Sequence, residues 1–152
     1  MNEVTTWKQE GLLSLWHYTE NERNYPGWHL SADPAGSVSL SALLRAFEAS
    51  KVESYRTLTI MVPSRAVLGV PNNRGGGAGY RAPSKWRLKY LPDPDNAKIW
   101  HFEEANNVVE LALGSDGLED LITGVKDIAS GKGDYSIGLD GNEELWFWWW
   151  PK

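Results

Sequence analysis

The stretch that decides the fold closes the 152-residue chain: Asn142-Glu143-Glu144-Leu145-Trp146-Phe147-Trp148-Trp149-Trp150-Pro151-Lys152. Its aromatic side chains and flanking turn residues predict a β-strand that the proline ends. Side chains alternate across a strand, so one face carries Leu145, Phe147 and Trp149, and the other carries Trp146, Trp148 and Trp150. Both faces are apolar. The strand therefore either lies between two layers of the protein, or keeps one face for a partner while the Leu145 face packs on a helix.

The composition predicts a single globular domain over residues 1–152. A chain of this length can bury a core, and 41% hydrophobic with 23% charged residues is typical of a folded protein. The sequence contains no cysteine, which excludes disulfides and Cys-ligated metals. The N-terminus lacks the pattern of a signal peptide, and no apolar run approaches the ~20 residues of a membrane helix. We therefore expect a cytoplasmic protein that does not contact membranes.

Charge is distributed unevenly along the chain. Residues 51–98 contain nine basic and three acidic groups, a net charge of +6, whereas residues 99–152 contain three basic and eleven acidic groups, a net charge of −8. One interpretation is that these segments lie side by side and neutralise each other. The other is that an acidic surface attracts a basic partner, or a basic patch binds an anion. The acidic total, −5, disfavours nucleic acid as the main ligand.

Hydrophobic periodicity predicts an α+β fold, a mostly antiparallel sheet packed with two amphipathic helices. A first helix would begin at Ser37 or Ser39, after a break at residues 33–36, and would bury Leu40, Leu43, Leu44 and Phe47. A second would begin with an Asp116–Glu119 capping box and end at Gly131. The expected strands are residues 12–18, 28–32, 55–62, 85–91, 98–103, 108–113, 134–138 and the closing tryptophan strand. Residues 92–96 would join two of these strands as a hairpin, residues 106–107 would form another turn, and residues 139–142 would turn the chain into its last strand.

Two segments share an order of residues: Leu15-Trp16-His17-Tyr18-Thr19-Glu20 and Ile99-Trp100-His101-Phe102-Glu103-Glu104. Each is followed by a strand, a helix and a strand. The sequence is therefore consistent with an internal repeat of β-β-α-β units within one sheet, or with chance similarity.

Residues 71–83 contain four glycines within five positions and predict a flexible surface loop. Arg74 and Arg81 flank the bare backbone, but no Gly-Lys-Ser/Thr follows and no helix begins there, so the pattern does not indicate a phosphate site. A loop that contacts a partner, through Arg74, Tyr80 and Arg81, is the alternative to an ordinary surface loop.

The sequence offers no recognisable catalytic or metal site. The spacing of His17, His29 and His101 is unlike that of metal ligands, and we expect His17 and His101 to be half-buried in the sheet. The serines lack a G-x-S-x-G elbow, and the adjacent carboxylates would point to opposite faces. We expect neither a cofactor nor a metal, and a non-catalytic protein. An enzyme would need a cleft that brings His17 or His101 near a carboxylate.

The tryptophans offer the strongest candidate for a binding surface. If no layer covers Trp146, Trp148 and Trp150, their indoles form an exposed patch that marks a binding site, with Glu143 beside them. Core filling is the alternative, and we expect it for Trp16, Trp100 and Trp149. An exposed patch would serve either a protein partner or a small molecule or carbohydrate that stacks on the rings.

The last third of the chain resembles small immunity proteins of bacterial polymorphic and contact-dependent toxin systems. The resemblance lies in residues 108–121 (a strand followed by a Gly-Ser helix start), in residues 133–137, and in the aromatic strand Leu145-Trp146-Phe147-Trp148. It implies a cytoplasmic protein that binds and neutralises one toxin domain without catalysis. On this basis we expect an acidic, aromatic-anchored surface that covers a basic toxin.

Overall fold

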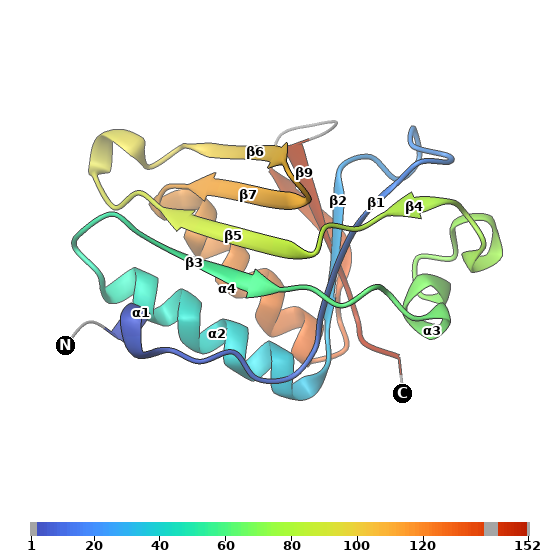
Figure 1. Ribbon diagram of the computed structural model, residues 1–152, viewed down its shortest axis with the longest axis horizontal. Helices are drawn as coiled ribbons and strands as arrows, with labels where there is room; N and C mark the ends of the chain where they lie inside the picture. The colour runs from blue at the N-terminus through green and yellow to red at the C-terminus, as the bar shows by residue number, and fades with distance from the viewer. Residues whose placement is uncertain (1–2, 139–142, 152) are drawn as a thin grey trace.

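Two β-sheets and two long helices form the framework of the computed structural model, which describes residues 3–138 and 143–151 (Figure 1). The α+β class is confirmed, but the strands form two sheets rather than one. Sheet A contains, in spatial order, β4 (Tyr80–Arg81), β1 (Leu13–Tyr18), β2 (Trp28–Ala32), β9 (Glu144–Trp148) and β8 (Asp134–Gly138). Sheet B contains β3 (Ser54–Thr59), β5 (Lys85–Tyr90), β7 (Val108–Leu113) and β6 (Trp100–Ala105). Neighbouring strands are antiparallel except for the pairs β2–β9 and β5–β7.

The two sheets follow the same plan. In sheet A the hairpin β1–β2 is joined in parallel by β9, which pairs antiparallel with β8. In sheet B the hairpin β6–β7 is joined in parallel by β5, which pairs antiparallel with β3. Each hairpin leads through a long helix into a strand of the other sheet, so β3 and β5 of the first half lie in sheet B, whereas β8 and β9 of the second half lie in sheet A. The strand order is therefore an internal repeat, built from longer units than the sequence predicted.

The shared Leu-Trp-His and Ile-Trp-His segments do not occupy equivalent places in this repeat. Trp16 points away from the helices into a second core, whereas Trp100 packs against the main core. The similarity of the two segments therefore does not reflect the structural repeat.

Helix α2 (Pro34–Ala49) begins earlier than predicted. Asp33 is its N-cap and accepts a hydrogen bond from the backbone N–H of Gly36 at 2.6 Å, while Pro34 occupies the first helical position. The residues that we expected to break the chain therefore form the first turn, because proline at this position loses no hydrogen bond and has a helical φ angle. The predicted buried stripe, from Leu40 to Phe47, is confirmed.

Helix α4 (Ser115–Ala129) packs against α2. Its N-cap is Gly114, not Asp116, and no side chain caps it. Its C-terminus is as predicted: Gly131 has a φ of +75°, and the N–H of Lys132 donates to the carbonyl of Asp127 at 2.8 Å. This is the hydrogen-bond pattern of a Schellman motif. The motif places a residue with a positive φ angle just after the helix, and glycine adopts this conformation most readily.

The main core lies between the helices and the two sheets. Sheet B places one face on the helices, through Trp86, Leu88 and Leu111, and leaves the other face towards solvent (Figure 1). Sheet A contributes Leu15, Leu30, Leu145 and Phe147 from its helix-facing side. Burying large apolar side chains is the main stabilising contribution to such a fold.

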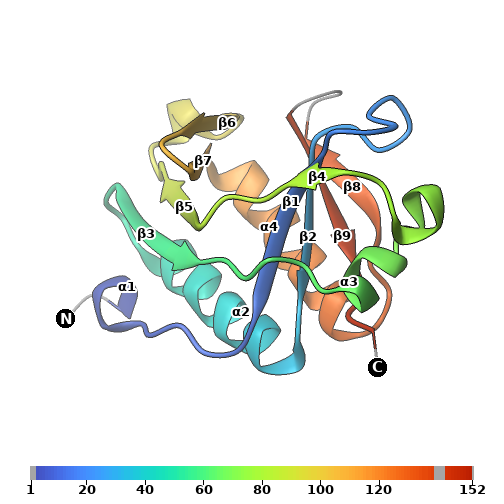
Figure 2. The same cartoon turned by 45° about the vertical axis from the view of Figure 1, so that its right-hand side comes forward.

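A second core covers the opposite face of sheet A. The chain between β3 and β5 folds over this face as α3 (Arg65–Gly69), the 3-10 turn η1 (Asn73–Gly76) and β4 (Figure 2). Its buried members are Trp16, Tyr18, Val67, Leu68, Ala78 and Trp148. Sheet A is therefore buried on both sides, as the two apolar faces of the tryptophan strand allowed.

The remaining elements differ from expectation in two ways. Strands β5 and β6 do not form a hairpin, because β7 lies between them; the 3-10 turn η2 (Pro94–Asn96) carries the chain across the end of the sheet. A short helix, α1 (Glu3–Thr6), precedes β1.

Asn106 and Asn107 form the predicted turn between β6 and β7 with positive φ angles. The expected turn at residues 139–142 lies outside the described residues. Among the described helices, none combines the length and apolar character needed to cross a membrane.

Candidate functional site

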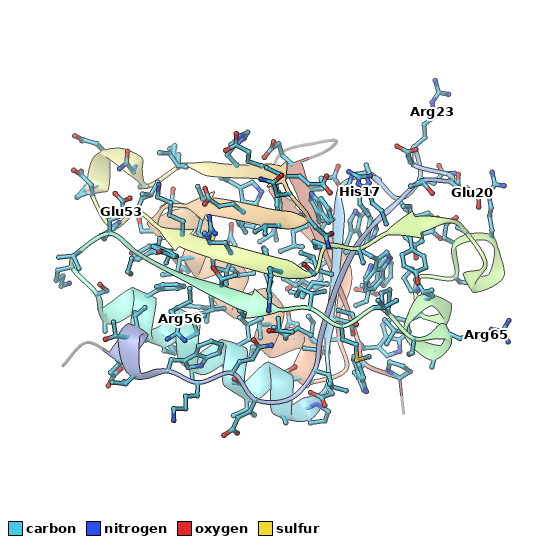
Figure 3. The ribbon with its side chains drawn as sticks, in the orientation of Figure 1. His17, Glu20, Arg23, Glu53, Arg56 and Arg65 are labelled. Atoms are coloured by element: carbon cyan, nitrogen blue, oxygen red, sulfur yellow. The ribbon has the colours of Figure 1, made fainter. Side chains whose placement is uncertain are left out.

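A polar cleft of about 300 Å³ marks the seam where β1, β2 and β4 of sheet A meet β6 of sheet B. It is lined by His17, Glu22, Trp28, Arg81, Phe102, Glu104 and Glu143. Figure 3 shows His17 at this junction, at the end of β1 nearest to the strands of sheet B. Two of the predicted candidates, Arg81 and Glu143, meet here although they are far apart in the sequence.

Arg81 ties the sheets together. Its guanidinium donates from Nη2 to Glu104 at 3.0 Å and from Nε at 3.4 Å, and it lies 5.4 Å from the centre of the Trp28 ring. Such a paired, ring-stacked geometry suits arginine better than lysine. Nη1 also lies 3.2 Å from Nδ1 of His17, a nitrogen that is 3.0 Å from the carbonyl of Tyr18. One tautomer can make only one of these two hydrogen bonds.

Glu143 joins the start of β9 to the outer edge of β6. Its Oε2 accepts from the backbone N–H of Phe102 at 2.9 Å, and its backbone carbonyl accepts from the indole of Trp100 at 2.6 Å. Its Oε1 lies 3.3 Å from Nδ1 of His101. The carboxylate of Glu143 therefore satisfies a backbone N–H on the edge strand β6 that would otherwise face outward.

The seam has more negative than positive groups. Glu22, Glu104 and Glu143 face one guanidinium, that of Arg81, which is already paired with Glu104. The cleft could therefore accept a cation, and its aromatic walls, Trp28 and Phe102, suit the alkyl part of a basic side chain.

The condition that we set for an enzyme is met only in part. His101 lies beside a carboxylate, but its side chain is 62% exposed, contrary to the expectation of a half-buried residue, and it lies outside the residues that line the cleft. His17 is buried more completely than the half-buried side chain that we expected, and it lines the cleft beside Arg81.

The tryptophan face predicted as a binding surface lies against the second core. Trp148 is only 7% exposed, and Trp146 and Trp150 are partly buried against the same cluster. The rings of Trp146 and Trp148 stack on each other at 5.5 Å. Trp149, which we expected to pack on a helix, follows the end of β9 and is 37% exposed; that expectation was wrong because the strand ends at Trp148.

His29 organises this face, a role that no pattern in the sequence predicted. It is completely buried, and its ring stacks with Trp16, Trp146 and Trp148 at 5.7–6.2 Å. The indole of Trp148 donates to Nδ1 at 3.0 Å, so Nδ1 carries no proton, and Nε2 donates to the carbonyl of Tyr25 at 3.1 Å. Burial lowers the pKa of His29 to about 3, well below its ordinary value.

The glycine-rich loop is tied to residues 19–25. Asn73 is buried and bonds to Asn21 and to the carbonyl of Glu20, and the side chain of Glu20 accepts from the N–H of Gly79 at 2.6 Å. Arg74 pairs with Glu20 at 3.4 Å on the surface. Tyr80 is half-buried against the second core. Neither Arg74 nor Tyr80 lines the seam cleft, so the seven candidate residues do not form one site.

The basic middle and acidic last thirds of the chain do lie side by side. Ion pairs between them join Arg81 to Glu104, Arg87 to Glu110 and Lys98 to Asp116. The first two pairs connect β4 or β5 to sheet B strands of the acidic third, which supports mutual neutralisation. The sequence of one strand does not show which strand pairs with it. The sequence therefore could not identify Glu104 as the partner of Arg81.

Within residues 3–138 and 143–151, no group of three or more His, Asp or Glu side chains could hold a metal ion. No family model, no curated protein and no solved structure matches this chain.

Proposed function

We propose that this chain is a non-catalytic protein-binding module of the immunity type, which resides in the cytoplasm and neutralises a toxin domain with a basic surface. The observation that carries the proposal is the carboxylate excess of residues 99–152. It persists on the surface after the ion pairs with the basic middle third have formed.

Several of these carboxylates have no ion pair among the described residues. They are Glu103 on β6, Glu119 and Asp120 on α4, and Asp134 on β8. All four are exposed. Exposed, unpaired carboxylates steer a basic partner towards the surface and raise its association rate.

The seam adds a place for a basic side chain of the partner. Its carboxylates outnumber its cation, and its rings can contact an alkyl stem. The stacked tryptophans would then act indirectly, by holding β9 and with it Glu143 in position. This differs from the aromatic anchor expected from the sequence, because Trp148 lies in the second core.

The proposal is tested by co-purifying the tagged full-length chain from its native host, at low and at high ionic strength. The expected result is one stoichiometric protein of basic surface, whose toxicity falls when the chain is co-expressed. Its affinity should fall as salt rises, because exposed charge pairs are screened. Recovery of the chain without a stoichiometric partner, or with a partner whose affinity is insensitive to salt, would contradict the proposal.

A further inference from the structure

The outer edge of β8 is a row of backbone groups that faces away from sheet A. The N–H of Trp149 donates to the carbonyl of Gly133 at 3.1 Å, which fixes the pairing pattern of β8 with β9. Alternate residues of an antiparallel strand direct their backbone groups to opposite sides. Tyr135 therefore pairs with β9, whereas the N–H and C=O of Asp134 and Ser136 point outward, with no hydrogen bond to another described residue.

The corresponding edge of sheet B is covered. Strand β3 occupies the place in sheet B that β8 occupies in sheet A, and the N-terminal segment runs along it. The side-chain amide of Gln9 donates to the carbonyl of Thr59 at 2.9 Å and accepts from its N–H at 2.8 Å. Arg56 donates to the carbonyl of Val4 and lies over the ring of Trp7 (Figure 3).

Gln9 shows how such an edge takes a partner. Its side-chain amide has the donor and acceptor of a peptide group, and it makes the two hydrogen bonds that an added strand would make with Thr59. The other edge of sheet B, at β6, is occupied by the carboxylate of Glu143. The long edge strand β8 has no such cover from the described residues.

Carboxylates lie along the side of α4 that neighbours β8. Asp116, Asp120 and Asp127 lie on one side of α4 at helical spacing, and Asp134 lies on β8 itself. Tyr135 confirms how close they are: it donates to Asp127 at 2.6 Å. Its pKa is raised by burial, by that hydrogen bond, and by the negative charges of Asp127, Asp120 and Asp134. Of these carboxylates, Asp116 pairs with Lys98 at 3.6 Å.

A surface pocket of about 290 Å³ opens at the end of the same edge. It is lined by Lys98, Trp100, Asp116, Gly117, Asp120, Ile137 and Gly138. Apolar contacts with Trp100 and Ile137 suit an alkyl stem, and the carboxylates of Asp116 and Asp120 suit a cationic head. Proteins that bind an extended peptide at a sheet edge combine backbone hydrogen bonds with such a side-chain pocket.

We propose that the edge of β8 binds an extended, lysine- or arginine-rich segment of a partner protein, which adds to sheet A as a further strand. The inference rests on the proposed protein-binding function and assigns its contact surface. Backbone groups of Asp134 and Ser136 hold the added strand, and the pocket receives one basic side chain. The row of carboxylates on α4 selects against acidic segments, because like charges along a strand repel.

The test uses the full-length protein and two short peptides, one alternating lysine with threonine and the other alternating glutamate with threonine. Threonine favours the extended conformation in both peptides. The lysine peptide should cause saturable changes in the backbone amide NMR signals of Asp134 and Ser136, and should slow their hydrogen exchange. The glutamate peptide should leave these signals unchanged. Equal binding of the two peptides, or changes that cluster away from β8, would overturn the proposal.

Matched variants distinguish the contribution of the β8 backbone groups from that of the α4 carboxylates. Ser136→Pro removes an outward N–H without removing a hydrogen bond to β9, and should abolish binding of the lysine peptide. Asp120→Lys should weaken it roughly three- to tenfold, the effect of losing one exposed attraction and adding a repulsion. Glu3→Lys makes the same charge change on α1, beside the edge strand β3 of sheet B, and should leave the affinity within about twofold. If both lysine variants weaken binding equally, the carboxylates of α4 have no specific role in binding the peptide.

The outcome for the edge can be distinguished from that for the function. A stoichiometric native partner whose affinity survives both Ser136→Pro and Asp120→Lys would overturn the edge and leave the protein-binding function standing. Binding of the lysine peptide at β8 without any native partner would support the β8 edge and overturn the protein-binding function.

Discussion

The burial of His29 predicts that acid destabilises this protein. Its pKa is lowered from 6.5 to about 3, chiefly by burial. Protonation of Nδ1 would also break the hydrogen bond that this nitrogen accepts from Trp148. Below pH 6.5 the unfolded chain binds a proton that the folded chain excludes. The stability that the neutral ring contributes is therefore complete above this pH, and is lost as the pH falls towards 3.

The magnitude follows from the size of the shift. One pKa unit corresponds to about 1.4 kcal/mol, so two pH units below the ordinary histidine pKa, near pH 4.5, His29 alone should lower the free energy of unfolding by about 3 kcal/mol. The ring is completely buried, so solvent does not reduce this figure. A loss of this size is a large fraction of the stability of an ordinary domain.

The assay is urea unfolding at pH 7.0 and pH 4.5, followed by tryptophan fluorescence, for the wild type and for His29→Gln. Glutamine can donate and accept as the neutral imidazole does, but it does not titrate. The wild type should lose about 3 kcal/mol more than the variant between the two pH values. Equal losses, or an NMR titration of the His29 ring in the folded protein with a midpoint above pH 5, would refute the reasoning.

Two further predictions concern the packing of the fold. Gln9→Ala should cost about 1 kcal/mol, the net worth of a hydrogen bond, and should raise light scattering on storage, because it uncovers the edge of β3; a variant that stays as monodisperse as the wild type would contradict this. Gly124→Ala should lower the free energy of unfolding by about 1–3 kcal/mol in urea titrations, because its new methyl group would overlap the ring of Phe147. In the matched control Gly69→Ala the methyl group meets no atom, so a similar loss in both variants would show that packing is not the cause.

Local patterns predicted most of the elements. Strands over residues 28–32, 108–113 and 134–138 were predicted with their observed bounds, because the apolar and turn residues that delimit them act over a few positions. The start of α2 was missed because Asp33 and Pro34 occur both in turns and at helix starts, and only the hydrogen bond to Gly36 distinguishes the two cases.

The arrangement of the elements could be predicted much less well. Strands β5 and β6 are close in sequence and resemble a hairpin, yet β7 inserts between them because the parallel pairing of β5 with β7 is decided by the whole sheet. The cover over Trp148 comes from residues 65–82; the sequence predicted only a loop for residues 71–83 and no element for residues 65–70. The candidate site was predicted in fragments, since Arg81 and Glu143 meet only after the two sheets have formed.

The exchange of strands between the halves has a consequence for the order in which the chain can fold. Strand β9 is the last element of the chain but lies inside sheet A, between β2 and β8. During synthesis the β1–β2 hairpin must wait for the C-terminal residues before its sheet can close. Such pairing between the ends of a chain makes folding slow and late. Closure of sheet A thus depends on β9, and a truncated chain without this strand would leave the apolar faces of β2 and α4 exposed.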